Sequence, residues 1–139
     1  MNTDLCNAFV KICTEQYRKV CETGMLQENR SIFGTPPESI IICFGFSQKN
    51  DEWKPLSEKE AVFRYSSHGL QTAAPDTVPD NTANGMYYKE AYAELCCQEN
   101  GVAFMMIQFG KRYARCYRYR IEQDAETIQL VDETLIWAS

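Results

Sequence analysis

The chain has 139 residues and a mass of 16.0 kDa, with 45% hydrophobic and 24% charged residues. This composition is that of an ordinary globular domain and excludes a chain that is disordered throughout. Nineteen acidic and 14 basic residues give a net charge of −5, which disfavours nonspecific binding to nucleic acid or to an anionic membrane. We therefore expect a single domain over residues 1–139, with a protein partner whose surface is basic.

The beginning of the chain predicts an amphipathic helix. Asn2, Thr3 and Asp4 are of the types that cap helix N-termini, and apolar residues then recur at steps of three and four. Gly24 ends this pattern, so the helix should cover about residues 3–22. The apolar stripe is wide, which is typical of a helix that lies across a sheet.

Strand and loop patterns alternate in the next part of the chain. Residues 25–37 predict a loop, because they end in two prolines that restrict the backbone. The β-rich run Ser39–Ser47 predicts a central strand, and residues 60–66 predict a second one. Residues 67–85 are rich in Pro, Thr, Asp, Asn and Gly, and they predict a long surface loop.

Residues 85–99, preceded by Asn84 as a cap, predict a second helix. The remaining chain predicts strands over 102–109, 112–121 and 127–137. The predicted order is α-β-β-α-β-β-β, which gives an α+β fold: a mostly antiparallel sheet of about five strands with two helices packed on one face. The apolar face of the predicted second helix holds Tyr88, Ala91, Tyr92, Leu95 and Cys96.

The seven cysteines are an odd set, placed mostly at apolar positions of periodic segments. This is typical of reduced thiols packed as small hydrophobes and predicts a cytoplasmic protein. The polar, acidic N-terminus is unlike a secretory or transit peptide, and no run is apolar for the roughly 18 residues of a spanning helix. Since the one close cysteine pair, Cys96 with Cys97, is adjacent and poorly placed to chelate, we expect no metal and no cofactor.

His68 is the one histidine in the chain, so any cysteine–histidine catalytic pair must use it. Cys43, on the preceding predicted strand, would be its best partner. A lone histidine at the end of a strand is more commonly solvated, and we therefore expect a protein that is not an enzyme. A small-ligand-binding domain or an enzyme that uses Cys43 and His68 is kept as an alternative.

Opposite charges follow one another near the C-terminus. Five basic residues fall within 111–120, interleaved with tyrosines, and five acidic residues fall within 122–133. Tyrosine and arginine in alternation can bind single-stranded nucleic acid, but the net charge of −5 favours ion pairs between two neighbouring strands instead. We expect Asp132 to face a basic residue of the 112–121 strand.

The leading functional prediction is a small acidic cytosolic binding protein, without catalysis, that neutralises a protein partner such as a basic toxin or a nucleic-acid-handling effector. In size, acidity and α+β plan the chain resembles bacterial toxin-immunity proteins and phage-encoded antagonists. An alternative is a dimeric secretion chaperone, although those chaperones usually finish with a helix; both a monomer and a homodimer are left open. Loop carboxylates beside an aromatic ring suit an anchoring role, which predicts these partner-binding residues: Asp51, Glu52, Trp53, Asp76 and Asp80.

Overall fold

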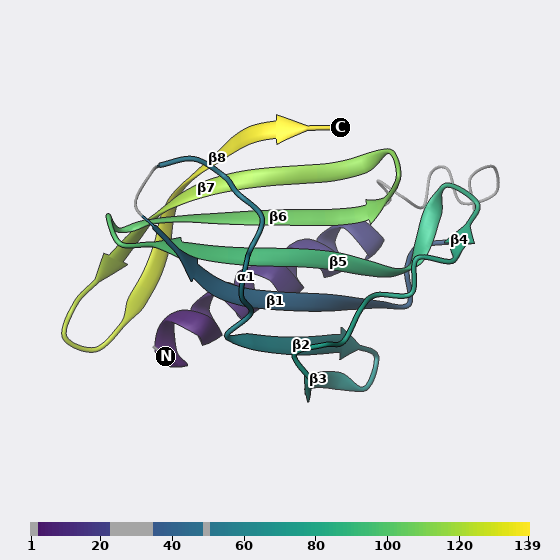
Figure 1. The fold of residues 1–139 in the computed structure, drawn as a ribbon, viewed down its shortest axis with the longest axis horizontal. Coiled ribbons are helices and arrows are strands. Elements are labelled where there is room, and N and C mark those ends of the chain that lie inside the picture. Colours follow the sequence, from purple (N-terminus) through teal and green to yellow (C-terminus); the bar gives the residue numbers. More distant parts are fainter. Residues whose placement is uncertain (1–2, 23–34, 49–50) are drawn as a thin grey trace.

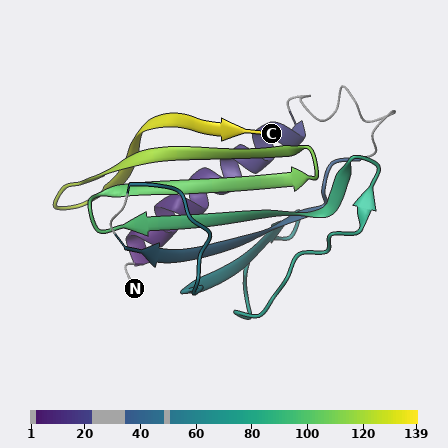
Figure 2. The same ribbon diagram turned by 45° about the horizontal axis from the view of Figure 1, so that its top comes forward.

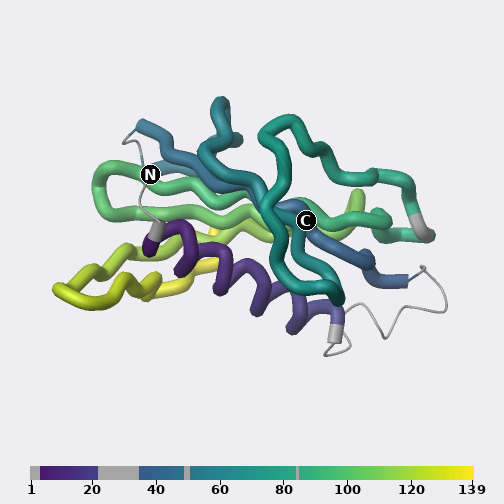
Figure 3. The backbone as a smooth tube through the Cα atoms, turned by 90° about the horizontal axis from the view of Figure 1, so that it is seen from below, coloured from purple at the N-terminus to yellow at the C-terminus, as the bar shows by residue number. Residues whose placement is uncertain are grey.

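The structure, a computed structural model, describes residues 3–22, 35–48 and 51–139. Within these ranges one helix, α1 (Thr3–Glu22), lies beneath a twisted sheet and crosses it obliquely (Figures 1, 2 and 3). No helical segment of the described ranges combines the length and the hydropathy needed to cross a bilayer. The strands are β1 (Ser39–Ser47), β2 (Ala61–Ser66), β3 (Gly69–Ala73), β4 (Ala83–Asn84), β5 (Tyr87–Gln98), β6 (Val102–Gly110), β7 (Tyr113–Gln123) and β8 (Ile128–Ala138).

The sheet is mixed. Seven strands follow the order β3-β2-β1-β5-β6-β7-β8, and the two-residue β4 pairs with β5 beside this path. The central neighbours β1 and β5 run parallel, with Ser39 opposite Glu90 and Ser47 opposite Gln98. All other neighbouring strands are antiparallel. Because β8 ends the order, its outer edge has no neighbouring strand among the described residues.

The predicted fold class is wrong in three respects. The segment 85–99, predicted as a second helix, is the strand β5, so a single helix and not two packs on the sheet in the described chain. The sheet is larger than the five strands expected, and the parallel pairing of β1 with β5 makes it mixed and not mostly antiparallel. Two strands, β3 and β4, also interrupt the predicted loop at 67–85, while most of the predicted loop at 25–37 lies outside the described residues.

The helix prediction failed at β5 because this strand is buried on both faces. Ala91, Ala93 and Leu95 face the core at intervals of two, but the residues between them are largely buried as well. A strand covered on both sides lacks the clean apolar–polar alternation of a half-exposed strand. Its alanine, glutamate, leucine and glutamine are good helix formers, and the pairing with β1 and β6 overrides that weak local preference.

The predictions for α1 over residues 3–22 and for a strand at Ser39–Ser47 are confirmed. The apolar stripe of α1 packs on alternate residues of β1, β5 and β6 to form the main core. Phe9 meets Phe44 with ring centroids 5.9 Å apart, and the ring of Tyr17 stacks on Phe109 at 6.0 Å. The Tyr17 hydroxyl donates a 2.8 Å hydrogen bond to the Pro37 carbonyl, so its polar end is satisfied inside the core.

Thiol reactivity tests this core. No disulfide joins the seven cysteines, all of which lie in the described ranges, and six of them are buried while Cys21 is half-buried. Burial raises the thiol pKa values, that of Cys116 to about 12, and the thiolate is the reactive form. We expect Ellman's reagent to modify one thiol quickly in the native protein and all seven in denaturant, and Cys21→Ser to abolish the fast phase. Rapid modification of several native thiols would contradict this packing.

Candidate functional site

The face of the sheet opposite α1, called the outer face here, is crossed by two irregular segments. Residues 51–60 leave the end of β1, run over β5 and β6, and return to β2 (Figure 1). Trp53 packs there against Val102, Phe104 and Cys116, and Leu56 packs against a second small apolar cluster around Cys43. The other segment, residues 74–82, joins β3 to β4. The two segments cover the middle of the outer face.

Three polar side chains on β5, Glu90, Glu94 and Gln98, hold these segments. They recur at every fourth residue, lie on the outer face, and are only 6%, 7% and 5% exposed. We call them the polar row. Each accepts a hydrogen bond from a backbone N–H of a crossing segment: Asp80 to Glu90 at 3.0 Å, Leu56 to Glu94 at 3.2 Å and Asp51 to Gln98 at 3.0 Å. The polar row thus supplies partners to backbone groups that no strand satisfies.

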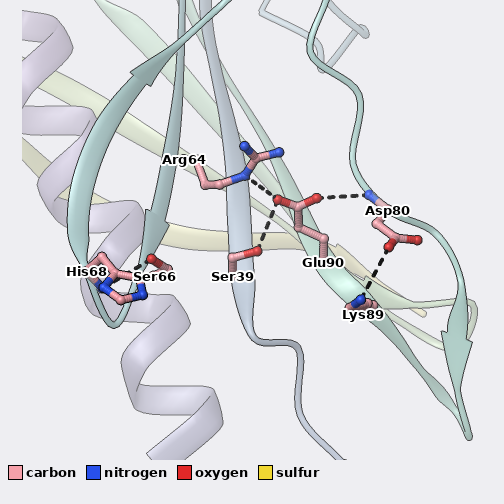
Figure 4. Close-up of polar contacts among 7 residues, drawn as sticks. All are labelled: Ser39, Arg64, Ser66, His68, Asp80, Lys89 and Glu90. Carbon is pink, nitrogen blue, oxygen red and sulfur yellow. Dashed lines mark hydrogen bonds and ion pairs between the residues drawn. The ribbon is translucent and has the colours of Figure 1, made fainter.

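Glu90 is the most heavily bonded member of the polar row (Figure 4). Its carboxylate accepts Arg64 Nε at 2.6 Å and the Ser39 hydroxyl at 3.0 Å, besides the Asp80 amide. Burial alone would raise its pKa, but the hydrogen bonds from Arg64, the Asp80 backbone and Ser39 together bring the pKa below its ordinary value. Glu90 is therefore held as a carboxylate.

Glu94 has the opposite electrostatics. Burial raises its pKa, and the hydrogen bonds from the Leu56 amide and the Tyr92 hydroxyl offset this only in part. The charge of Lys59 also lowers the pKa, but within the described chain Lys59 forms no ion pair with Glu94. Glu94 is thus the member of the polar row whose charged form the fold disfavours.

The predicted partner-binding residues Asp51, Glu52 and Trp53 lie together at the Gln98 end of β5. The Asp51 carboxylate pairs with Arg118 Nε at 3.0 Å, and its backbone has the positive φ of 54° that aspartate tolerates better than most residues. The Glu52 carbonyl accepts Gln98 Nε2 at 2.9 Å. Trp53 is half-buried, so this ring is part of the packing of the outer face.

The other two predicted residues, Asp76 and Asp80, lie in the second crossing segment. Asp76 is exposed in a turn, and the Asp80 carboxylate accepts the Thr82 amide at 3.0 Å. Asp80 sits at the Glu90 end of β5, eight strand residues from Gln98, a distance of roughly 26 Å at about 3.3 Å per residue. The structure therefore places the five predicted residues in two groups and does not join them into one patch.

Cys43 and His68 are not brought together. Cys43 is buried in the middle of β1 opposite Val62, whereas His68 is exposed in the turn after Ser66, which pairs with Ser39 at the start of β1. Four strand residues, roughly 13 Å, separate these two positions along β1. Cys96 and Cys97 point to opposite faces of β5, and the described residues contain no cluster of three or more potential metal ligands.

The exposed residues that sequence reasoning missed are in the second half of β8. Leu135, Ile136 and Trp137 are 52%, 44% and 37% exposed and follow one another on the strand that ends the sheet. Asp132, with a positive φ of 57°, precedes them where the register with β7 shifts, and it pairs with Arg120 Nε at 2.9 Å. We call residues 132–138 the β8 edge. Their sequence predicts a strand, but no local pattern says that this strand lies at the border.

The two glutamates of the polar row predict opposite pH effects. Glu90→Gln removes a carboxylate with a lowered pKa, so it should cost about 1–2 kcal/mol of unfolding free energy at neutral pH, and the cost should shrink as pH falls below the unfolded glutamate pKa of about 4.3. Glu94→Gln removes a carboxyl with a raised pKa. Its stability should equal or exceed that of the original protein at neutral pH, with the difference vanishing near pH 4.

Urea unfolding of both variants at pH 4 and pH 7 measures these effects. The two substitutions change the same chemical group on the same strand, so each is the control for the other. Equal losses of stability in both variants at pH 7 would show that the two carboxyls do not differ as described.

Comparison with known proteins adds no relative from which a function could be transferred. No protein-family model, no curated protein sequence and no solved structure matches the chain. A function for this chain must therefore be inferred from its own surface, of which the β8 edge is the part with the most exposed apolar side chains in succession.

Proposed function

We propose that the protein is a non-catalytic binding protein that captures a basic protein partner by adding a strand of that partner to the β8 edge. The observation that carries the proposal is the run of exposed apolar residues on β8, a border strand whose outer edge has no neighbouring strand among the described residues. Three of the six exposed large hydrophobic residues in the described ranges, Leu135 to Trp137, lie there in succession. A surface strand of this kind is a template for pairing with another chain.

The backbone of the β8 edge supports strand addition. On its inner side β8 pairs with β7 as far as Ala138, and the Ser139 and Ala114 backbones exchange hydrogen bonds of 2.9 and 3.3 Å. The strand is therefore held by β7 to its end, with register shifts at residues 132–133 and at Ile136, and its opposite row of backbone groups has no neighbouring strand in the described chain. In strand addition, main-chain hydrogen bonds give affinity and alternate side chains give specificity.

Charge supports a basic partner. Asp132 and Glu133 open the β8 edge, and further carboxylates come from Glu122 at the end of β7 and from Asp124 and Glu126 in the turn. On β7, Arg120 pairs with Asp132 and Glu122, and Arg115 donates to the Ser139 carbonyl. The whole chain carries a net charge of −5. An acidic border beside apolar side chains favours a strand with lysine or arginine beside aliphatic residues.

Two further observations agree with a binding role inside the cell. Cys43, the cysteine that the enzyme alternative requires, lies in the middle of β1, and His68 lies in the turn that follows Ser66, four strand positions away along β1. The cysteines are mostly buried thiols joined by no disulfide, all seven being in the described residues, and such thiols suit a reducing cytoplasm. Neutralisation of the partner would follow if the captured strand borders the partner's own functional surface.

Tryptophan fluorescence tests the proposal, because Trp137 lies at the edge and the chain has only one other tryptophan, Trp53. Titration with a short capped peptide that alternates lysine and valine should shift the emission to the blue, and Trp137→Phe should remove the shift. Ile136→Lys should weaken binding at least tenfold, because it places a cation against the cationic strand.

Val78→Lys is the matched control, since Val78 is the most exposed large hydrophobic residue of the described chain and lies outside β8. This variant should bind the peptide as the original protein does. The proposal fails if the alternating glutamate–valine peptide binds as well as the lysine–valine peptide, or if Ile136→Lys and Val78→Lys bind alike. A stable dimer that closes the β8 edge would instead support the chaperone alternative.

A further inference from the structure

A cavity of about 510 Å³ lies at the carboxyl ends of the two parallel strands β1 and β5. Pro55 and Leu56 of the first crossing segment form its apolar wall, and Phe46 borders it at the end of β1. The volume falls within the roughly 300–1,000 Å³ of typical small-molecule sites. Neither the polar row nor the β8 edge contributes a side chain to it, so the cavity is separate from the surfaces described above.

The walls of this cavity are fixed before any ligand arrives. Leu56 packs on the outer-face cluster of Ile41, Cys43 and Val62, whereas the Phe46 ring lies on the α1 face against Phe44, with centroids 5.3 Å apart. Gly45 has no room for a side chain, because a Cβ would lie 2.7 Å from the Glu58 carbonyl oxygen, so the crossing segment rests directly on β1. The backbone amide of Leu56 donates a hydrogen bond to the Glu94 carboxylate of β5, which also holds the crossing segment on the sheet. A preorganised wall lowers the ordering cost of binding.

The polar groups of the cavity carry both signs of charge. Lys54 comes from the crossing segment and Glu99 from the turn after β5, and both are exposed at the cavity. Neither side chain forms an ion pair with another described residue. Ser47 and Ser57 add hydroxyl groups to the lining. The cavity thus offers an ammonium, a carboxylate and hydroxyls beside an apolar platform.

We propose that this cavity binds a free α-amino acid with an apolar side chain. The ligand carboxylate meets Lys54, its ammonium meets Glu99, and its side chain lies against Pro55 and Leu56. A zwitterion is the chemistry that satisfies both charges at once, because a simple acid leaves Glu99 without a partner and a simple amine leaves Lys54 without one. A residue inside a peptide lacks both charges, which sets the free amino acid apart from a protein segment.

Chemical-shift titration of the full chain with L-phenylalanine tests this proposal. The amides of Ser47, Leu56 and Ser57 should shift, with a dissociation constant in the millimolar range that is typical of a ligand of this size. Phenethylamine and 3-phenylpropionate, which each lack one charge, should bind at least about fivefold more weakly. The capped amino acid, acetyl-phenylalanine amide, should not shift these amides.

Lys54→Gln and Glu99→Gln should each weaken L-phenylalanine binding at least about fivefold, since both residues are exposed and the fold does not depend on them. Lys111→Gln and Glu58→Gln are the charge-matched controls outside the cavity lining and should bind as the original protein does. Absence of shifts at Ser47, Leu56 and Ser57, equal binding of the three ligands, or equal binding by cavity and control variants would overturn the proposal. Ile136→Lys should leave L-phenylalanine binding unchanged. The amino-acid proposal and the β8 proposal can therefore fail separately.

Discussion

The structure depends on the match between three buried polar side chains of β5 and the backbone of two segments that belong to no strand. Burying a carboxylate or an amide without a partner costs several kcal/mol, and so does burying an unpaired backbone N–H. Hydrogen bonds between the polar row and the crossing segments remove this cost. Glu90, Glu94 and Gln98 accept hydrogen bonds from the backbone N–H groups of Asp80, Leu56 and Asp51. In the described part of the chain no buried side-chain nitrogen or oxygen is left without a hydrogen bond. The crossing segments therefore cover the centre of the outer face, and polar contacts of specific geometry hold them there.

This closure decides where the protein can meet other molecules. With α1 on one face and the crossing segments on the other, the middle of the sheet is covered in the described chain, and the two sites that we propose, the β8 edge and the cavity beside Leu56, lie at its border. The surface ion pairs around them, such as Arg120 with Asp132, add little stability in solvent, at most about 1 kcal/mol each. They do shape the charge that an arriving partner meets. The scaffold thus has a closed centre, and the binding that we propose takes place at its border.

Much of the fold follows from local sequence, but the arrangement of its elements does not. Helix α1 and the strand Ser39–Ser47 carry clear periodic patterns, and the expected pairing of Asp132 with a basic residue of the preceding strand is confirmed by Arg120. Residues 87–98 were misread because a strand buried on both faces, rich in alanine and glutamate, has the same pattern as an amphipathic helix. The parallel neighbour β1 lies some fifty residues earlier in the chain, Ser39 opposite Glu90, and no local signal reports such a contact. For the same reason, the sequence predicts that Leu135 to Trp137 form a strand but not that this strand lies at the border of the sheet. Nor does it indicate that the Trp53 ring packs against the sheet.

Native-state hydrogen exchange at single-residue resolution tests most directly whether the polar row closes the outer face. The amides of Asp51, Leu56 and Asp80 lie in irregular segments, where exchange is ordinarily fast, yet each donates to a buried side chain of β5. We predict that these three amides exchange as slowly as amides inside the sheet, while the exposed amide of Asp76 exchanges freely. If all four exchange at the rate of an unstructured peptide, the crossing segments are not held by the polar row, and the closed centre described here does not exist.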